Sequence, residues 1–345
     1  MIIPVNTASI LPFIEPLKSA SNLVIVTHKN PDGDAIGSSL GILLLLEKYG
    51  VKAHVVVEDE LPYFLHFLPR SQDVIIYNSD PRRVQELISS ASFIICTDFS
   101  QLNRCGKLEP FVRQSSAPRI LFDHHPEPDL ASFQAVYHDV TASSTSELIA
   151  IFASSFFTDV PITTDWATCI YTGMVTDTGC FRFSLRPQTF QIAANLLQSN
   201  IPVQQIITQI FDSYSFQRIQ LTGFVLQNKL RYLPEYRTAY FSLSETEMMP
   251  FNPRRGDTEG LVNHTLSIEG VVLGVFFNQK PDDTIRISFR SKGAFACNDI
   301  ASKFFNGGGH RNASGGQYAG TIEEAIEYFL KVLPQYKDQL ISLSL

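Results

Sequence analysis

Histidine and aspartate side chains, which are common ligands of metal ions, gather in short segments that lie far apart in the chain. One segment reads HKNPDGDAIGSS from residue 28, a second places an aspartate after FIICT, and a third reads DHH after RILF. Carboxylates and imidazoles without thiolates suit Mn²⁺, with Mg²⁺ or Co²⁺ as substitutes. A site this acidic could hold two ions roughly 3.5–4 Å apart, the arrangement used for in-line displacement at phosphorus. The residues concerned are His28, Asp32, Asp34, Asp98, Asp123, His124 and His125.

The spacing of the two aspartates in the first segment favours a shared ligand. Asp32 and Asp34 are one residue apart, so an extended loop would point both carboxylates to the same side. Gly33 and Gly37 keep the backbone free of side chains, and a helix that starts here offers unpaired N–H groups to an anion. Because so many carboxylates at one place would repel one another, the sequence predicts that cations neutralise them.

Further candidates lie in the second half of the chain. Asp177 lies in GMVTDTGCFRF, and the helical pattern of Asp165–Met174 places it just past a helix end. Asn306–Gly316 reads NGGGHRNASGG, and we expect its glycines to form a loop whose exposed N–H groups bind an anion. Apolar and polar residues alternate over Ile285–Ser291, so Arg290 lies on the polar face, where an arginine could clamp a phosphate.

The elements that would position these residues follow from hydrophobic patterns. Four short runs are almost continuously apolar and rich in β-branched residues, as strands covered on both faces are. Helical patterns alternate with them, at Ala35–Tyr49 and Arg82–Ser89, so we expect a parallel α/β sheet. His28, Asp98 and Asp123 directly follow three of the runs, and parallel sheets bind ligands at the carboxyl ends of their strands. The predicted strands are Leu23–Thr27, His54–Val57, Phe93–Thr97 and Arg119–Phe122.

The last part of the chain predicts a second, smaller α/β domain. Apolar residues at helical spacing over Gln188–Lys229 indicate a helical connector, after which strand patterns return. Thr321 and Glu324 make a capping box for the helix that follows them. We therefore expect a metal-binding domain at 1–187, a connector at 188–233 and a second domain at 234–345. The strands predicted for the second domain are Thr238–Leu243, Val271–Phe277 and Thr284–Ser291, and the helices are Thr258–Leu266, Asn298–Phe305 and Ile322–Leu333.

Composition narrows the class of protein. The chain has 345 residues, 44% of them hydrophobic and 18% charged, which fits a folded protein of about two domains. Its 27 basic and 34 acidic residues give a net charge of −7, which argues against binding long duplex nucleic acid on a broad basic surface. Five cysteines without a C-x-x-C pair, a polar start of the chain and no apolar stretch of about 20 residues predict a cytoplasmic protein without a membrane segment.

Several of these motifs, taken together and in this order, resemble those of a known family. HKNPDGDAIGSS, Asp98, the DHH of Asp123–His125 and TDTGCFRF are similar to the motifs of the DHH phosphoesterase superfamily. FRS at Phe289–Ser291 and GGGHRNASGG resemble the accompanying DHHA1 domain. By size and arrangement the chain looks like the bacterial oligoribonuclease (nanoRNase)/pAp phosphatase group. The resemblance implies two domains with the active site in the cleft between them.

The resemblance also implies a role for each candidate residue. The expected ligands are His28, Asp32 and Asp98 for one Mn²⁺ ion, and Asp34, Asp98, His124 and Asp177 for the other. Asp98 would bridge the two ions, and a hydroxide between them would be the nucleophile. His125 would contact the phosphoryl group, and Asp123 would orient a histidine. The residues that would bind the substrate phosphate are Arg290, Gly308, Gly309 and His310.

The activity that the resemblance implies is hydrolysis of phosphoester bonds in very short oligonucleotides (nanoRNA) and in pAp. A phosphodiesterase for c-di-AMP or its linear product pApA needs the same metals and phosphate grip, so the motifs leave it open. An inorganic pyrophosphatase or exopolyphosphatase would need a more basic cleft, and a non-catalytic nucleotide sensor often lacks a metal ligand. The expected partners are short single-stranded oligonucleotides or small nucleotides, without long duplexes or membranes, and a homodimer is left open.

Overall fold

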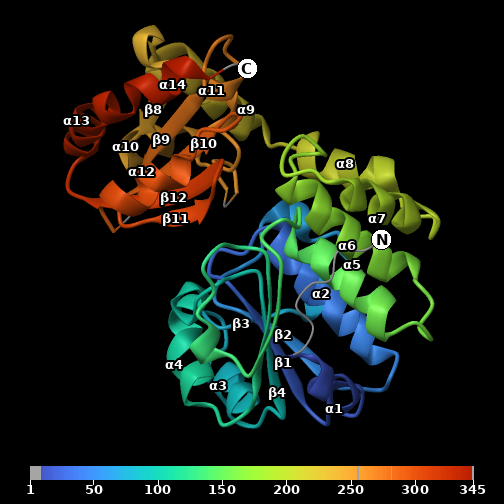
Figure 1. Ribbon diagram of the computed structural model, residues 1–345. Coiled ribbons are helices and arrows are strands. Elements are labelled where there is room, and N and C mark those ends of the chain that lie inside the picture. Colours follow the sequence, from blue (N-terminus) through green and yellow to red (C-terminus); the bar gives the residue numbers. More distant parts are fainter. Residues whose placement is uncertain (1–8, 255, 281, 344–345) are drawn as a thin grey trace. The chain divides into compact units, whose positions relative to one another are not determined.

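The computed structural model describes residues 9–254, 256–280 and 282–343 and divides into two units (Figure 1). The N-terminal unit is Met1–Ser213 and the C-terminal unit is Tyr214–Leu345. The change of unit falls within the predicted helical connector, whose bounds stay a prediction. Among the described residues, no helix combines the length and the apolar character needed to cross a membrane.

The N-terminal unit contains the parallel sheet that the sequence predicts. Its six strands are ordered β3-β2-β1-β4-β5-β6, and every neighbouring pair is parallel. The predicted β1 and β4 are confirmed to the residue, and β2 and β5 within one residue; β3 and β6, which are short or end in polar residues, lacked a clear pattern. The bounds are β1 Leu23–Thr27, β2 Ala53–Val57, β3 Ile75–Ile76, β4 Phe93–Thr97, β5 Arg119–Asp123 and β6 Ala135–His138.

The strand order reverses at β1, which pairs with β2 on one side and with β4 on the other. The chain therefore leaves the carboxyl ends of β1 and β4 in opposite directions, and such a switch point is where open α/β sheets bind ligands. His28 and Asp98 follow these two strands directly. The topology therefore places the first two ligand segments at the binding edge.

Helices cover both faces of this sheet (Figure 1). On one face, α2, α5 and α6 pack against Leu23 and Ile25 of β1, and on the other face α3 and α4 pack against Val24 and Val26. This two-sided burial is why β1 is a continuous apolar run. The bounds are α1 Ile14–Lys18, α2 Gly33–Glu47, α3 Pro81–Ser89, α4 Glu109–Gln114, α5 Thr145–Phe156, α6 Thr164–Asp177, α7 Pro187–Leu197 and α8 Val203–Phe211.

Two of these helices, α2 and α6, approach each other closely because a glycine lies between them. A Cβ atom on Gly37 would lie 2.5 Å from the carbonyl oxygen of Cys169 and 3.0 Å from the backbone nitrogen of Gly173. No larger residue fits at position 37 without moving backbone. The close approach brings Asp34, in the first turn of α2, toward Asp177, which is the last residue of α6 rather than a residue beyond its end.

The C-terminal unit is built on a mixed sheet of order β11-β12-β10-β9-β8-β7, in which only β8 and β9 pair in parallel. Phe277, Phe289 and Phe329 lie in its core. The predicted capping box is confirmed, because the Glu324 N–H donates to Thr321 Oγ1 (3.2 Å) and the Thr321 N–H to Glu324 Oε2 (2.8 Å). The strands are β7 Arg231–Leu233, β8 Thr238–Leu243, β9 Leu273–Gln279, β10 Thr284–Ser291, β11 Gly308–His310 and β12 Ala313–Ala319. The helices are α9 Phe216–Phe224, α10 Glu245–Met248, α11 Asn263–Leu266, α12 Cys297–Phe304, α13 Ile322–Val332 and α14 Lys337–Ser342.

Two predictions for this unit are wrong in part. The helix predicted over Thr258–Leu266 contains only α11, because the chain turns before it and Gly260 has a left-handed φ of 74°. The glycine-rich Asn306–Gly316 segment is largely strand rather than loop, since it contributes β11 and the start of β12. Glycine allows this close pairing, because a Cβ atom on Gly307 would lie 2.0 Å from the carbonyl oxygen of Gly315.

Candidate metal centre

Three groups of histidine and aspartate side chains converge at the carboxyl edge of the parallel sheet. Within each group the ligand atoms lie within 4.8 Å of one another. They come from the ends of β1, β4 and β5, from the first turn of α2 and from the last residue of α6. The predicted convergence of segments distant in sequence is therefore observed. The groups are His28, Asp32 and Asp98; Asp34, His124 and Asp177; and Asp98, Asp123 and His125.

In the first group, the Nε2 atom of His28 faces two carboxylates. It lies 3.8 Å from Asp32 Oδ1 and 3.5 Å from Asp98 Oδ2. The other ring nitrogen, Nδ1, lies 2.9 Å from the carbonyl oxygen of Lys29, and because a carbonyl only accepts, Nδ1 carries the hydrogen. In the neutral ring the lone pair is therefore on Nε2, which is the arrangement of metal-binding histidines. Burial lowers the pKa of His28, but the neighbouring carboxylates of Asp32 and Asp98 outweigh burial and raise the pKa to about 10.

Asp32 is held by the start of helix α2. Its Oδ1 atom accepts from the N–H groups of Asp34 (3.0 Å) and Ala35 (3.1 Å), so it is the N-cap of the helix. Burial raises the pKa of Asp32, but the neighbouring imidazole of His28 lowers it below its usual range. The cap explains why the helix starts before Ala35, where the sequence placed it.

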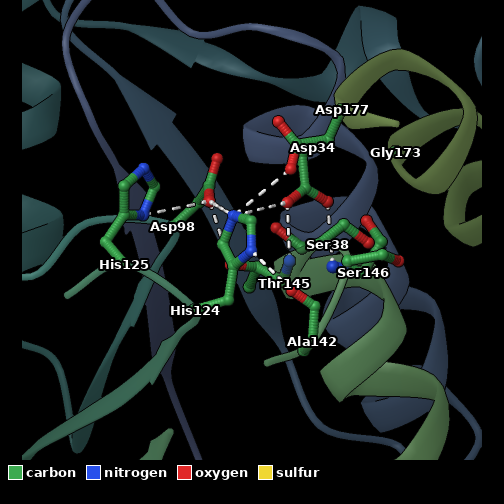
Figure 2. Close-up of polar contacts among 12 residues, drawn as sticks. Asp34, Ser38, Asp98, His124, His125, Ala142, Thr145, Ser146, Gly173 and Asp177 are labelled. Atoms are coloured by element: carbon green, nitrogen blue, oxygen red, sulfur yellow. Dashed lines mark hydrogen bonds and ion pairs between the residues drawn. The ribbon is translucent and has the colours of Figure 1, made fainter. Parts of the chain in front are cut away.

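In the second group, His124 faces three carboxylates (Figure 2). Its Nε2 atom lies 3.4 Å from Asp177 Oδ2, 3.7 Å from Asp98 Oδ1 and 3.9 Å from Asp34 Oδ2. Its Nδ1 atom lies 3.2 Å from the carbonyl oxygen of Ala142, which fixes the ring in the same way as Lys29 fixes His28. Burial, followed by the charge of Asp98, raises the pKa of Asp34 to about 7, and burial with the charge of Asp34 raises the pKa of Asp177.

Asp98 lies between the first and the second ligand group. Its Oδ2 atom faces His28, whereas its Oδ1 atom lies 3.7 Å from both His124 Nε2 and His125 Nδ1. The backbone of Asp98 has a left-handed φ of 66°, and its N–H donates to the carbonyl of Phe122 (2.9 Å). Such strain in a non-glycine residue persists only where the surroundings impose it, and it collects at functional sites.

His125 is oriented by Asp123. The His125 Nδ1 atom lies 2.8 Å from Asp123 Oδ1, and Asp123 is fully buried. Burial lowers the pKa of His125, but the hydrogen bond and charge of Asp123 raise it to about 9. The buried carboxylate of Asp123 thus fixes the ring position of His125 and favours its protonated form.

The sequence analysis did not identify the residues that hold Asp34. At the start of α5, the Thr145 N–H donates to Asp34 Oδ2 (2.6 Å) and the Ser146 N–H donates to Asp34 Oδ1 (2.9 Å) (Figure 2). The Thr145 hydroxyl donates to Asp98 Oδ1 (2.9 Å). The signal was the S-x-x-E pattern of Ser144 and Glu147, in which Ser144 Oγ accepts from the Glu147 N–H (2.9 Å) and caps the helix.

The donor set of this edge fits divalent cations. Two imidazole Nε2 atoms, each fixed by a carbonyl on Nδ1, converge with four carboxylates, and no thiolate takes part. Burial, together with repulsion from neighbouring carboxylates, raises the pKa of Asp34 and Asp177, and a bound cation would offset both effects. Carboxylate and imidazole ligands of this kind suit Mn²⁺ and Mg²⁺.

The predicted phosphate-binding residues lie together on the C-terminal sheet. Ala313 of β12 pairs with Arg290 on one side and with His310 on the other, so all three share one face of the sheet. Next to them, Gly315 pairs with Ser288 and with Gly308, which leaves a strip without large side chains. Gly309 has a left-handed φ of 128° and lies against β12.

Comparison with known families gives two matches, one for each unit. The DHH family, N-terminal domain, matches residues 22–174, which contain every candidate metal ligand except Asp177. The DHHA1 domain matches residues 240–338, which contain the four predicted phosphate-binding residues.

Relatives with named activities cover the chain almost completely. A bifunctional oligoribonuclease and PAP phosphatase NrnA from Thermus thermophilus is 30% identical over 92% of this chain and 91% of its own length. A cyclic-di-AMP phosphodiesterase PdeA from Listeria monocytogenes is 27% identical over 93% of this chain but only 49% of its own length. Among solved structures, an exopolyphosphatase-related protein from Bacteroides fragilis is 37% identical, covers 99% of this chain and 100% of its own, and superposes with a TM-score of 0.91.

Proposed function

Since this chain belongs to the DHH family of phosphoesterases, we propose that it is a Mn²⁺-dependent hydrolase that degrades short oligonucleotides to mononucleotides and dephosphorylates pAp. The observation that carries the proposal is the position of Asp98, which faces a histidine of each ligand group through a different carboxylate oxygen. A relative that matches over nine tenths of both chains is named for these two activities. A net charge of −7 favours short substrates over long polyanions.

The proposed cation sites follow the two ligand groups. Asp98 would serve both sites, one through Oδ2 and the other through Oδ1. When bound, the cations would polarise the phosphoryl oxygens and lower the pKa of a water molecule so that it attacks at neutral pH. The remaining ligands are His28 and Asp32 for one site, and Asp34, His124 and Asp177 for the other.

The chain's own side chains would handle the phosphoryl group and the proton. His125, held through Nδ1 by Asp123, would present Nε2 to a phosphoryl oxygen and donate a hydrogen bond or proton to the leaving oxygen. Arg290 and His310 would bind a substrate phosphate above the strip that Gly308 and Gly315 leave bare. A grip on a single phosphate fits small substrates such as nanoRNA and pAp.

A second candidate is hydrolysis of c-di-AMP or pApA, which the similarity to the Listeria monocytogenes phosphodiesterase favours. The match covers only 49% of that relative, so the activity of the whole relative does not follow for this chain. The same cation sites and phosphate grip would serve both substrates. We therefore rank this activity second.

Side-by-side kinetics would test the proposal. Purified protein with Mn²⁺ would be offered a labelled RNA trimer, pAp, pApA and c-di-AMP, with a long RNA duplex and polyphosphate as controls. We expect kcat/KM to be highest for the trimer and pAp, because kcat/KM ranks substrates by transition-state binding. A clear preference for c-di-AMP would replace the proposal with the second candidate. No hydrolysis of any of them with Mn²⁺, Mg²⁺ or Co²⁺ would overturn both.

A further inference from the structure

One short segment supplies most of the polar contacts that orient the second ligand group. Ala142 accepts the hydrogen bond from His124 Nδ1, and the backbone N–H groups of Thr145 and Ser146 both donate to Asp34 (Figure 2). The Thr145 hydroxyl also reaches Asp98. The position of this segment, residues 142–146, therefore fixes where His124 and Asp34 point.

A partly buried ion cluster holds this segment from both ends. Just after the segment, Glu147 is 0% exposed, and its Oε1 atom lies 2.5 Å from the guanidinium of Arg186. Just before the segment, Asp139 Oδ2 lies 2.6 Å from Arg186 Nη1. The same nitrogen donates to Thr141 Oγ1 (2.7 Å). One arginine thus links the two ends of the orienting segment.

Hydroxyl groups complete the cluster around the buried carboxylate. The Oε2 atom of Glu147 accepts from the hydroxyls of Ser143 and Thr189, both at 2.6 Å. Removing the cation that pairs with a buried carboxylate strongly destabilises a protein, because it leaves an uncompensated charge in the interior. Glu147 therefore depends on Arg186, and the segment depends on both.

Two residues of the first ligand group are held by other means, and the third, Asp98, accepts from Thr145 through Oδ1, the atom that faces the second group. Asp32 accepts from the N–H groups of its own helix, and His28 Nδ1 is fixed by Lys29, the next residue in the chain. Neither contact involves residues 139–147 or Arg186. Loss of the ion cluster would therefore displace the ligands of the second group more than those of the first.

We propose that Arg186 is a positioning residue for the second cation site, where it fixes His124 and Asp34 through the segment 142–146. The inference rests on the proposed metal-dependent function. Residues that orient metal ligands from outside typically change metal affinity 10- to 100-fold when they are removed. We therefore expect loss of Arg186 to weaken Mn²⁺ binding at the second site while the first site keeps its affinity.

The test is titration of the purified, metal-free full chain with Mn²⁺ by calorimetry. In Arg186→Met we expect one site to keep its affinity within about threefold and the other to weaken at least 10-fold. The single substitution leaves Glu147 buried without its cation, which by itself can unfold the protein. The double variant Arg186→Met/Glu147→Gln removes that charge while keeping the contacts to Ser143 and Thr189, and we expect it to show the same split.

A matched control lies in the same unit. Arg70 also links two carboxylates, those of Glu47 and Asp73, and both of these lie outside residues 139–147. We expect Arg70→Met to leave both Mn²⁺ affinities unchanged. A general loss of stability would weaken both sites together in any of these variants, so it would not produce the split.

The outcomes separate the inference from the proposed function. If the wild-type chain binds no Mn²⁺, the proposed function fails, and the inference fails with it. If the wild-type chain binds two ions and the double variant keeps both affinities, or loses both equally, only the role of Arg186 is overturned. Two affinities that diverge in both Arg186 variants and not in Arg70→Met would establish the positioning role.

Discussion

Asp34, Asp98 and His124 in the N-terminal unit are at most 3% exposed, whereas Arg290 and His310 in the C-terminal unit lie half-buried on a regular sheet face. The buried group consists of like charges that burial makes costly, so each member has a fixed partner and one has a strained backbone. The sheet face needs only its strand register to place two cationic side chains beside a bare strip. A buried cluster of carboxylates thus needs many fixed hydrogen-bond partners, whereas a phosphate-binding face needs only two partly exposed cationic side chains at the right distance along the sheet.

The largest effect is expected in the metal centre, and it should fall on turnover. Asp98→Asn removes the charge that both cation sites share while keeping the shape and a residue type that tolerates a left-handed φ. We expect Mn²⁺-dependent kcat to fall about 1,000-fold or more, since several kcal/mol of charge stabilisation are lost. Thermal unfolding of the metal-free protein should be unchanged or shifted upward, because a repulsive charge has gone. Near-normal turnover in this variant would rule out a shared ligand.

A smaller effect is expected on the sheet face, and it should fall on binding. Arg290→Ala removes a charged donor to the substrate phosphate, which is worth about 1.5–3 kcal/mol, so KM for pAp should rise roughly 10- to 100-fold. Mn²⁺ affinity should not change, because Arg290 belongs to the other unit.

The matched control for this variant is Arg286→Ala, on the same strand and the same face but opposite Gln317 instead of Ala313. We expect its KM to stay close to that of the wild type. Equal effects of the two substitutions would mean that net charge, rather than the position beside His310, governs binding.

The same contrast explains what the sequence could predict. His28, Asp98 and Asp123 were located because each ends an apolar run that is buried on both faces, a pattern that survives without tertiary information. Helix α5 was not predicted because it is buried on almost all sides, so it lacks the polar stripe of an amphipathic helix. Thr145 and Ser146 lie in its first turn and were missed for the same reason. Strands β11 and β12 were missed because glycine disfavours strands locally, and only the pairing across Gly307 and Gly315 explains them.

The smallest effects should come from single methyl groups, and they should have opposite signs in the two regions. A Cβ atom on Gly173 would lie 2.0 Å from Ser146 Oγ and 2.8 Å from Asp34 Oδ1, whereas a Cβ atom on Gly308 would meet nothing within 4 Å. We expect Gly173→Ala to destabilise the protein by about 1–3 kcal/mol through overpacking. Gly308→Ala should leave stability unchanged or raise it by up to about 1 kcal/mol, because alanine loses less conformational entropy on folding.

Activity assays on these two glycine variants then locate the phosphate. If a substrate phosphate approaches the bare strip as proposed, Gly308→Ala raises KM for pAp without lowering the unfolding temperature, because the new methyl group occupies space only where a ligand would lie. Gly173→Ala should instead lower Mn²⁺ affinity, since it displaces the helix start that holds Asp34. Unchanged KM in Gly308→Ala would place the phosphate elsewhere on the C-terminal unit and would leave Arg290 and His310 without their expected common ligand.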